Sequence, residues 1–162
     1  MVRTGRKLRV YLETTIISYL AARPGRDLVT AAHQQVTADW CGIAGRFLRF
    51  SFRVWCLRNC GVVIQTRRIG ERLLLTGLLY SASGEPVGRL AHDLVEQKAI
   101  PQSAAADALH VAVAAVHQMD FLMTWNCTHI NNAQMISRLR KICELSGFEC
   151  PVICTPEELS GV

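Results

Sequence analysis

Three oxygen-bearing side chains have the chemistry and the spacing to hold a metal ion together. Glu13 follows a short β-rich stretch, residues 8–12, and Asn126 follows a second apolar stretch, residues 121–124. Both stretches are typical of buried strands, and open α/β sheets bind ligands at the carboxyl ends of their strands. Asp107 lies in a helical pattern that is apolar on nearly every side. We therefore expect its carboxylate to be buried and to need a cation, a metal or a dense shell of hydrogen bonds.

Each residue taken alone also has a simpler explanation. Glu13 is favoured by the helix dipole in a first turn, and Asn126 is a common loop residue. Asp107 fits a salt bridge or a solvent-facing notch, and we expect the neighbouring His110 to be a hydrogen-bonded core histidine. Together, however, Glu13, Asp107 and Asn126 offer oxygen ligands from three separate elements, which suits Mg²⁺ or Mn²⁺. Such an ion activates water and stabilises charge on a phosphate in transfer.

The elements that must position these residues alternate between strand and helix patterns. Besides the two strands above, the pattern predicts strands over residues 47–57, 62–65 and 152–154. It predicts helices from Thr14 to residue 22, over 28–40 after a cap at Asp27, from the turn at 83–86, from Pro101 to about residue 117 and over 131–146. A terminal helical turn is predicted to begin at residue 155. This alternation predicts an α/β fold with a mostly parallel central sheet and helices on both faces.

Length and composition indicate one globular domain over residues 1–162. Half of the residues are hydrophobic and 19% are charged, and no apolar run is long enough for a membrane-spanning helix. The basic N-terminus leads into too short an apolar stretch for a signal sequence, so we expect a cytoplasmic protein. The seven cysteines include no C-x-x-C pair, and we expect buried, reduced thiols rather than a metal site or a disulfide framework.

Residues 41–82 differ from the rest of the chain in composition. They contain seven arginines, three cysteines and a single acid, Glu71, whereas the remaining residues include eleven basic and twelve acidic side chains. The formal net charge of +5 therefore comes from this segment and is a weak argument for nucleic-acid binding. We interpret the segment as the product of a shifted reading frame.

Four motifs resemble the PIN-domain family, and specifically VapC-type toxins of bacterial toxin–antitoxin pairs. They read VYLETTIISYL at 10–20, AAADALH at 104–110, LMTWNCTHI at 122–130 and PVICTPEEL at 151–159. The resemblance covers residues 8–40 and 83–160, about three quarters of the chain. It implies a three-layer α/β/α sandwich, a carboxylate cluster that binds Mg²⁺ or Mn²⁺, and endonucleolytic cleavage of RNA. It also implies a cognate antitoxin as partner and a homodimer.

The resemblance gives the candidate residues catalytic and metal-binding roles. Glu13 takes the place of the first acid, which is more often Asp in the family, and Asp107 matches the acid on the later helix. Asn126 stands where many members have Asp. A further acid, expected near the start of the helix after the second strand, is missing, because Glu71 lies in different surroundings.

The missing acid keeps a second hypothesis open, namely a catalytically impaired PIN module that binds RNA or an antitoxin without turnover. Metal-dependent cleavage, as opposed to binding without turnover, distinguishes the two. A phosphatase or a receiver-like acid pocket also fits a carboxylate cluster at a sheet edge. The sequence lacks the Asp-x-Asp pair typical of the first and a suitable late-strand lysine for the second.

The reading-frame hypothesis predicts what the gene contains across codons 40–83. Each third base, read with the first two bases of the next codon, allows Ile-Phe-Val-Ser-Ser-Leu-Val-Ser for residues 49–57, Glu at Arg58/Asn59, and Gly-Asp-Pro-Asp-Ala-Ala for residues 62–68. These give a buried strand, the missing acid and a turn. Sequencing the gene tests this directly, and stop codons in the shifted frame would show that the segment is genuine.

Overall fold

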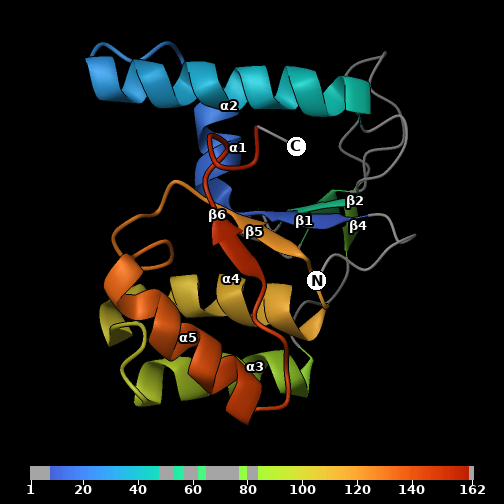
Figure 1. Ribbon diagram of the computed structural model, residues 1–162, viewed down its shortest axis with the longest axis vertical. Helices are drawn as coiled ribbons and strands as arrows, with labels where there is room; N and C mark the ends of the chain where they lie inside the picture. Colours follow the sequence, from blue (N-terminus) through green and yellow to red (C-terminus); the bar gives the residue numbers. More distant parts are fainter. Residues whose placement is uncertain (1–7, 48–52, 57–61, 65–76, 80–83, 161–162) are drawn as a thin grey trace.

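A parallel sheet forms the centre of the fold in this computed structural model (Figure 1). The structure describes residues 8–47, 53–56, 62–64, 77–79 and 84–160, with side chains for 8–42 and 84–160. Within these ranges the strand order is β2-β1-β5-β6. The strands are β1 (Arg9–Leu12), β2 (Arg53–Cys56), β5 (Phe121–Met123) and β6 (Val152–Cys154). A separate antiparallel pair consists of β3 (Val62–Ile64) and β4 (Gly77–Leu79).

The register of the sheet brings the carboxyl ends of its strands level with one another. Leu12 pairs with Met123, and Met123 pairs with Cys154. The next residue along each chain segment, Glu13 in the first case and Thr124 in the second, therefore leaves the sheet at the same edge. A site at this edge can therefore draw side chains from the loops that follow β1 and β5.

Helices lie on both sides of the sheet (Figure 1). On one side are α1 (Thr14–Ala21) and α2 (Leu28–Phe47), and on the other are α3 (Glu85–Glu96), α4 (Ala105–Val116) and α5 (Ala133–Leu145). A 3₁₀ turn, Gln102–Ala104, precedes α4. The described part of the chain is thus a mixed α/β fold, as the alternating pattern predicts.

Alternating side chains of the strands supply two hydrophobic clusters. Tyr11 and Leu122 pack with α3, α4 and α5, whereas Val10, Leu12 and Met123 pack with residues of α1 and α2. This is the two-residue period of a strand buried on both faces. Both clusters thus contain side chains of β1 and β5, the strands whose carboxyl ends form this edge of the sheet.

Local sequence signals set several of the helix ends. The Asp27 carboxylate accepts a hydrogen bond from the Thr30 amide at 2.8 Å, and the Asn132 side chain accepts one from Gln134 at the start of α5. Gly147 has φ +83° just after α5, a conformation that glycine adopts without strain. The predicted cap at Asp27 and the predicted end at Gly147 are confirmed.

Several predicted boundaries are wrong. The helix predicted over 28–40 extends to Phe47, so residue 47 is helical and does not start a strand. β2 and β3 lie within the strands predicted over 47–57 and 62–65. Residues 48–52, 57 and 65 of those predictions lie outside the described residues. In addition, Pro101 precedes a 3₁₀ turn instead of starting the α-helix, so α4 begins later than predicted.

The cysteines are free where the structure describes their side chains. Cys143 and Cys154 are buried, as predicted, and Cys41 and Cys150 are half-buried. Cys127 is exposed, so the prediction of burial is wrong at that position. Among the described ranges, none of the helices combines the length and the apolar character that a membrane span needs.

Two leucines of α5 test the packing of this helix. Leu139 is completely buried and Leu145 is 71% exposed. We predict that Leu139→Ala lowers the free energy of unfolding by about 2–5 kcal/mol, because it leaves a cavity in the core, whereas Leu145→Ala changes it by less than about 0.5 kcal/mol. Urea denaturation of both variants checks this, and equal losses would contradict the placement of α5.

Candidate active site

Glu13 is a buried carboxylate surrounded by hydroxyl groups. Glu13 follows β1, and the residue is 2% exposed. Thr14 donates a hydrogen bond to Oε1, while Thr15 and Thr124 donate to Oε2 at 2.5 and 2.8 Å. The threonines come from the start of α1 and from the end of β5, so the carboxylate joins these two elements. The dense shell of hydrogen bonds that we expected around a buried acid therefore surrounds Glu13.

The hydroxyl shell keeps Glu13 ionised. Burial by itself raises the pKa of this carboxyl group, but hydrogen bonds from Thr14, Thr15 and Thr124, together with the charge of His110 when it is protonated, lower it overall. His110 Nε2 lies 3.8 Å from Glu13 Oε1. Burial also lowers the pKa of His110 more than the neighbouring carboxylates raise it, so its imidazole is neutral at neutral pH. The hydroxyl groups are therefore the main source of stabilisation for the negative charge.

His110 is hydrogen-bonded, as predicted. Its Nδ1 lies 2.7 Å from the hydroxyl oxygen of Tyr11 on β1. The ring thus contacts one residue of the core through Nδ1 and faces Glu13 through Nε2. Because α4 carries both His110 and Asp107, this contact fixes the helix relative to the end of β1.

Asp107 lies closer to the start of its helix and is less buried than predicted. The 3₁₀ turn after Pro101 delays the start of α4 to Ala105, so Asp107 stands in the first turn of the helix and not almost two turns inside it. Its side chain is 17% exposed, which is partial rather than complete burial. Asp107 Oδ2 accepts hydrogen bonds from Asn126 Nδ2 and His129 Nδ1, both at 2.9 Å. The position also suits a carboxylate, because the helix dipole favours negative charge there.

Asn126 connects the two carboxylates. The backbone N–H of Asn126 donates a hydrogen bond to Thr124 Oγ1 at 2.9 Å, and the Thr124 hydroxyl in turn donates one to Glu13. Its side-chain nitrogen faces Asp107, whereas its side-chain oxygen accepts from the backbone N–H of His129 at 3.1 Å. The structure therefore brings Glu13, Asp107 and Asn126 into one network, but the oxygen of Asn126 is directed to the backbone of its own loop.

Sequence reasoning missed the groups that hold these side chains in place. Thr15 and Thr124 each bond Glu13 and also accept a backbone N–H of the loop after β5. His129 orients Asp107, and its position three residues after Asn126 is a turn spacing that could have identified it.

An aromatic cluster lies next to this network. The Trp125 ring stacks on His33 of α2 with centroids 4.0 Å apart, and Tyr19 of α1 meets both rings edge-on. Trp125 Nε1 donates to Thr37 at 2.7 Å, and Thr37 is fully buried. These contacts attach α1 and α2 to the loop that carries Asn126.

The donor set for a cation is limited. In residues 8–42 and 84–160, no group of three or more His, Cys, Asp or Glu side chains is arranged to hold a metal ion. Glu13 Oε1 and Asp107 Oδ1 are the carboxylate atoms with capacity to spare, because the hydrogen bonds in the described part of the chain go mainly to the other oxygens. Two carboxylates fit an ion that keeps several of its waters, such as Mg²⁺, and bind it more weakly than three or four would.

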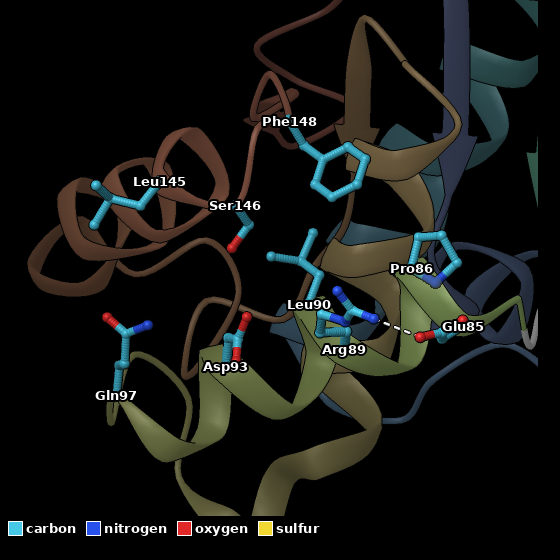
Figure 2. Close-up of a pocket in the computed structure, with 9 residues that line it drawn as sticks. All are labelled: Glu85, Pro86, Arg89, Leu90, Asp93, Gln97, Leu145, Ser146 and Phe148. Carbon is cyan, nitrogen blue, oxygen red and sulfur yellow. Dashed lines mark hydrogen bonds and ion pairs between the residues drawn. The ribbon is translucent and has the colours of Figure 1, made fainter.

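A hollow elsewhere on the surface is separate from this network. It has a volume of about 550 Å³ and lies between α3 and the end of α5 (Figure 2). Arg89 and Glu85 form an exposed ion pair at one end of it. None of Glu13, Asp107 or Asn126 lines it. The buried charges and the convergent hydrogen bonds, not this hollow, identify the candidate active site.

Comparisons with known proteins give no relative. No protein-family model matches the chain, and neither a curated protein nor a solved structure matches it significantly.

The lowered pKa of Glu13 predicts a specific dependence of stability on pH. A carboxyl group whose pKa is lower in the folded protein stabilises the fold above its unfolded pKa, near 4.5, and loses that contribution as the pH falls through the folded value. We predict that the stability difference between wild type and Glu13→Gln is largest at neutral pH and shrinks in acid. Urea denaturation at a series of pH values measures it, with the exposed Glu96→Gln as control. A difference that does not change with pH would contradict an ionised Glu13.

Proposed function

We propose that this protein is a metal-dependent endoribonuclease of the VapC toxin type, with a PIN-like three-layer α/β/α fold. The observation that carries the proposal is the coupling of Glu13 to Asp107 through Thr124 and Asn126 at the carboxyl edge of a parallel sheet. Carboxylates that come from separate elements and converge at such an edge are suited to chemistry on a phosphate. The helices on both sides of the sheet support the three-layer arrangement (Figure 1).

The chemistry of the donor atoms fits Mg²⁺ or Mn²⁺. Glu13 and Asp107 would hold the ion through carboxylate oxygens, which are hard ligands, and Asn126 would act through a water because its side-chain nitrogen faces Asp107. When bound, such an ion activates a water for attack on a phosphodiester and stabilises the charge on the phosphate.

The other residues of the network prepare these two carboxylates. Thr15 and Thr124 hold Glu13 in its ionised form, as a cation requires. His129 and Asn126 both donate to Oδ2 of Asp107, which leaves Oδ1 for the ion. Such supporting hydrogen bonds orient metal ligands and typically change metal affinity or activity by about 10–100-fold when they are removed.

The biological setting follows from the resemblance of the sequence motifs. The substrate is RNA, the partner is a cognate antitoxin protein, and the protein acts in the cytoplasm as a homodimer. The missing acid is expected within residues 41–82, most of which lie outside the described residues. On the reading-frame hypothesis the gene would encode a Glu at Arg58/Asn59 in the shifted frame, and the chain as written lacks that acid.

A second candidate is a catalytically impaired PIN module that binds RNA or an antitoxin without turnover. Two observations favour it. Three hydroxyl groups already donate hydrogen bonds to the Glu13 carboxylate, and the side-chain oxygen of Asn126 accepts one from the backbone N–H of His129. A site of this kind retains the arrangement of residues that the family has, but it binds a cation weakly.

Asp107→Asn tests the proposed activity. We predict that the substitution lowers Mn²⁺-dependent RNA cleavage by about 100-fold or more, because it removes a ligand, and ligands contribute more than their supporting groups. The fold stays intact, since an amide oxygen still accepts the hydrogen bonds of Asn126 and His129. Cleavage of a labelled RNA is measured beside far-UV circular dichroism.

The exposed Asp39→Asn, purified identically, is the matched control, and it retains wild-type cleavage. Equal activity of the wild type and Asp107→Asn would assign the cleavage to a contaminant and refute the proposal. Binding of RNA by the wild type without any cleavage in Mn²⁺ would support the impaired module instead.

A further inference from the structure

The hollow between α3 and the end of α5 has the size and the lining of a binding site. Its volume of about 550 Å³ lies within the range of pockets that hold ligands. Leu90 of α3, which is 1% exposed, forms part of the apolar lining together with Leu145 of α5, which is 71% exposed. The lining therefore combines apolar surface that is already buried with apolar surface that solvent still reaches.

The charges around this hollow do not balance. Arg89 stands four residues from both Glu85 and Asp93 on α3, and in the structure it pairs with Glu85 at one end of the hollow (Figure 2). Asp93 is half-buried, and within the described part of the chain its carboxylate forms no ion pair or hydrogen bond. The lining thus carries one uncompensated negative charge, which is costly at a partly buried position.

A second polar group and an aromatic ring lie around the same carboxylate. Ser146, just after α5, is half-buried, and its hydroxyl has no hydrogen-bond partner among the described residues. Ser146 and Asp93 point toward one another across the hollow, and the ring of Phe148 lies beside Leu90 (Figure 2). A ligand in the hollow therefore meets a carboxylate, a hydroxyl oxygen and an aromatic surface.

This combination matches the side chain of an arginine. A guanidinium group is planar, carries five N–H donors and stacks on aromatic rings, so it can contact Asp93, Ser146 and Phe148 together. The methylene groups behind it can pack on apolar surface such as that of Leu90. A lysine ammonium would compensate the charge but lacks the planar shape, and Asp93 would repel an anionic ligand.

The exposed apolar residues of the lining indicate that the arginine belongs to a polypeptide. Leu145 and Pro86 both line the hollow and are exposed. A small free cation beside Asp93 covers little of this apolar surface. A polypeptide with apolar residues on either side of the arginine covers it and gains the free energy of its burial.

We propose that the hollow between α3 and the end of α5 docks an arginine side chain of a partner polypeptide, with Asp93 as the counter-ion. The guanidinium binds Asp93 and Ser146, and the apolar neighbours of the arginine cover Leu145. None of the candidate active-site residues lines the hollow, so this interaction surface does not depend on the proposed nuclease function.

Titration of the full chain with the peptide acetyl-Leu-Arg-Leu-amide, followed in ¹⁵N-correlated NMR spectra, tests the proposal. We expect the peptide to shift the amide signals of Asp93, Ser146 and Phe148. Citrulline has nearly the same shape as arginine but no charge, and we expect the citrulline peptide to bind about 10-fold more weakly or less, because the charged hydrogen bonds are lost. Butylguanidinium, which lacks the apolar neighbours, is expected to bind more weakly than the arginine peptide.

Two acidic residues of α3 provide matched variants. Asp93→Asn removes the counter-ion, and we expect it to abolish the preference for arginine over citrulline. Glu96→Gln removes the same charge from an exposed position that does not line the hollow, and we expect it to retain the preference. Leu145→Ala is expected to weaken the binding of both peptides by the same factor.

Equal binding of the arginine and citrulline peptides to the wild type overturns the proposal, as do shift changes confined to residues outside the hollow. Butylguanidinium that binds as tightly as the arginine peptide overturns the assignment to a polypeptide. Because these comparisons use the wild-type chain, they do not depend on whether the variants fold.

Discussion

The buried charge of Glu13 constrains the structure around the carboxyl edge of the sheet. A carboxylate on a residue that is 2% exposed is costly unless hydrogen bonds replace its water, and here three threonine hydroxyls do so. Thr124 can contribute only if β5 lies beside β1 in the observed register. Thr15 can contribute only if α1 starts immediately after Glu13, and its hydroxyl then accepts the Trp125 amide. Strand pairing, the start of a helix and the course of a loop thus all depend on one charge.

A chain of hydrogen bonds leads from Glu13 to the second carboxylate, Asp107. The Thr124 hydroxyl accepts a hydrogen bond from the backbone N–H of Asn126, and the side chain of Asn126 donates one to Asp107. These bonds hold α4 to the loop after β5. His110 adds a second connection between α4 and the end of β1. A network so fully satisfied is rigid, which favours precise positioning of ligands. Because the carboxylates already accept hydrogen bonds, a cation must compete with these bonds. The outcome of this competition distinguishes an active nuclease from a module that only binds.

The sequence was sufficient for those parts of the fold that local pattern determines. An alternating stretch located β1, short apolar stretches located β5 and β6, and Asp27 and Gly147 marked helix ends. The start of α4 was mispredicted because Pro101 suits both a 3₁₀ turn and an α-helix, and that choice sets the burial of Asp107. The candidate residues were found by type and spacing, but their hydrogen-bond partners, and the direction of the Asn126 amide, depend on contacts between distant segments that spacing does not encode.

The most direct test of a cation site at this edge is paramagnetic broadening by Mn²⁺ in ¹⁵N-correlated NMR spectra of the full chain. We predict that substoichiometric Mn²⁺ selectively broadens the amide signals of Thr14, Asp107 and Asn126, because paramagnetic relaxation falls steeply with distance from the bound ion. Diamagnetic Mg²⁺ in excess then restores these signals. Broadening confined to other surface acids, or uniform weak broadening over the whole spectrum, would contradict a metal site formed by Glu13 and Asp107.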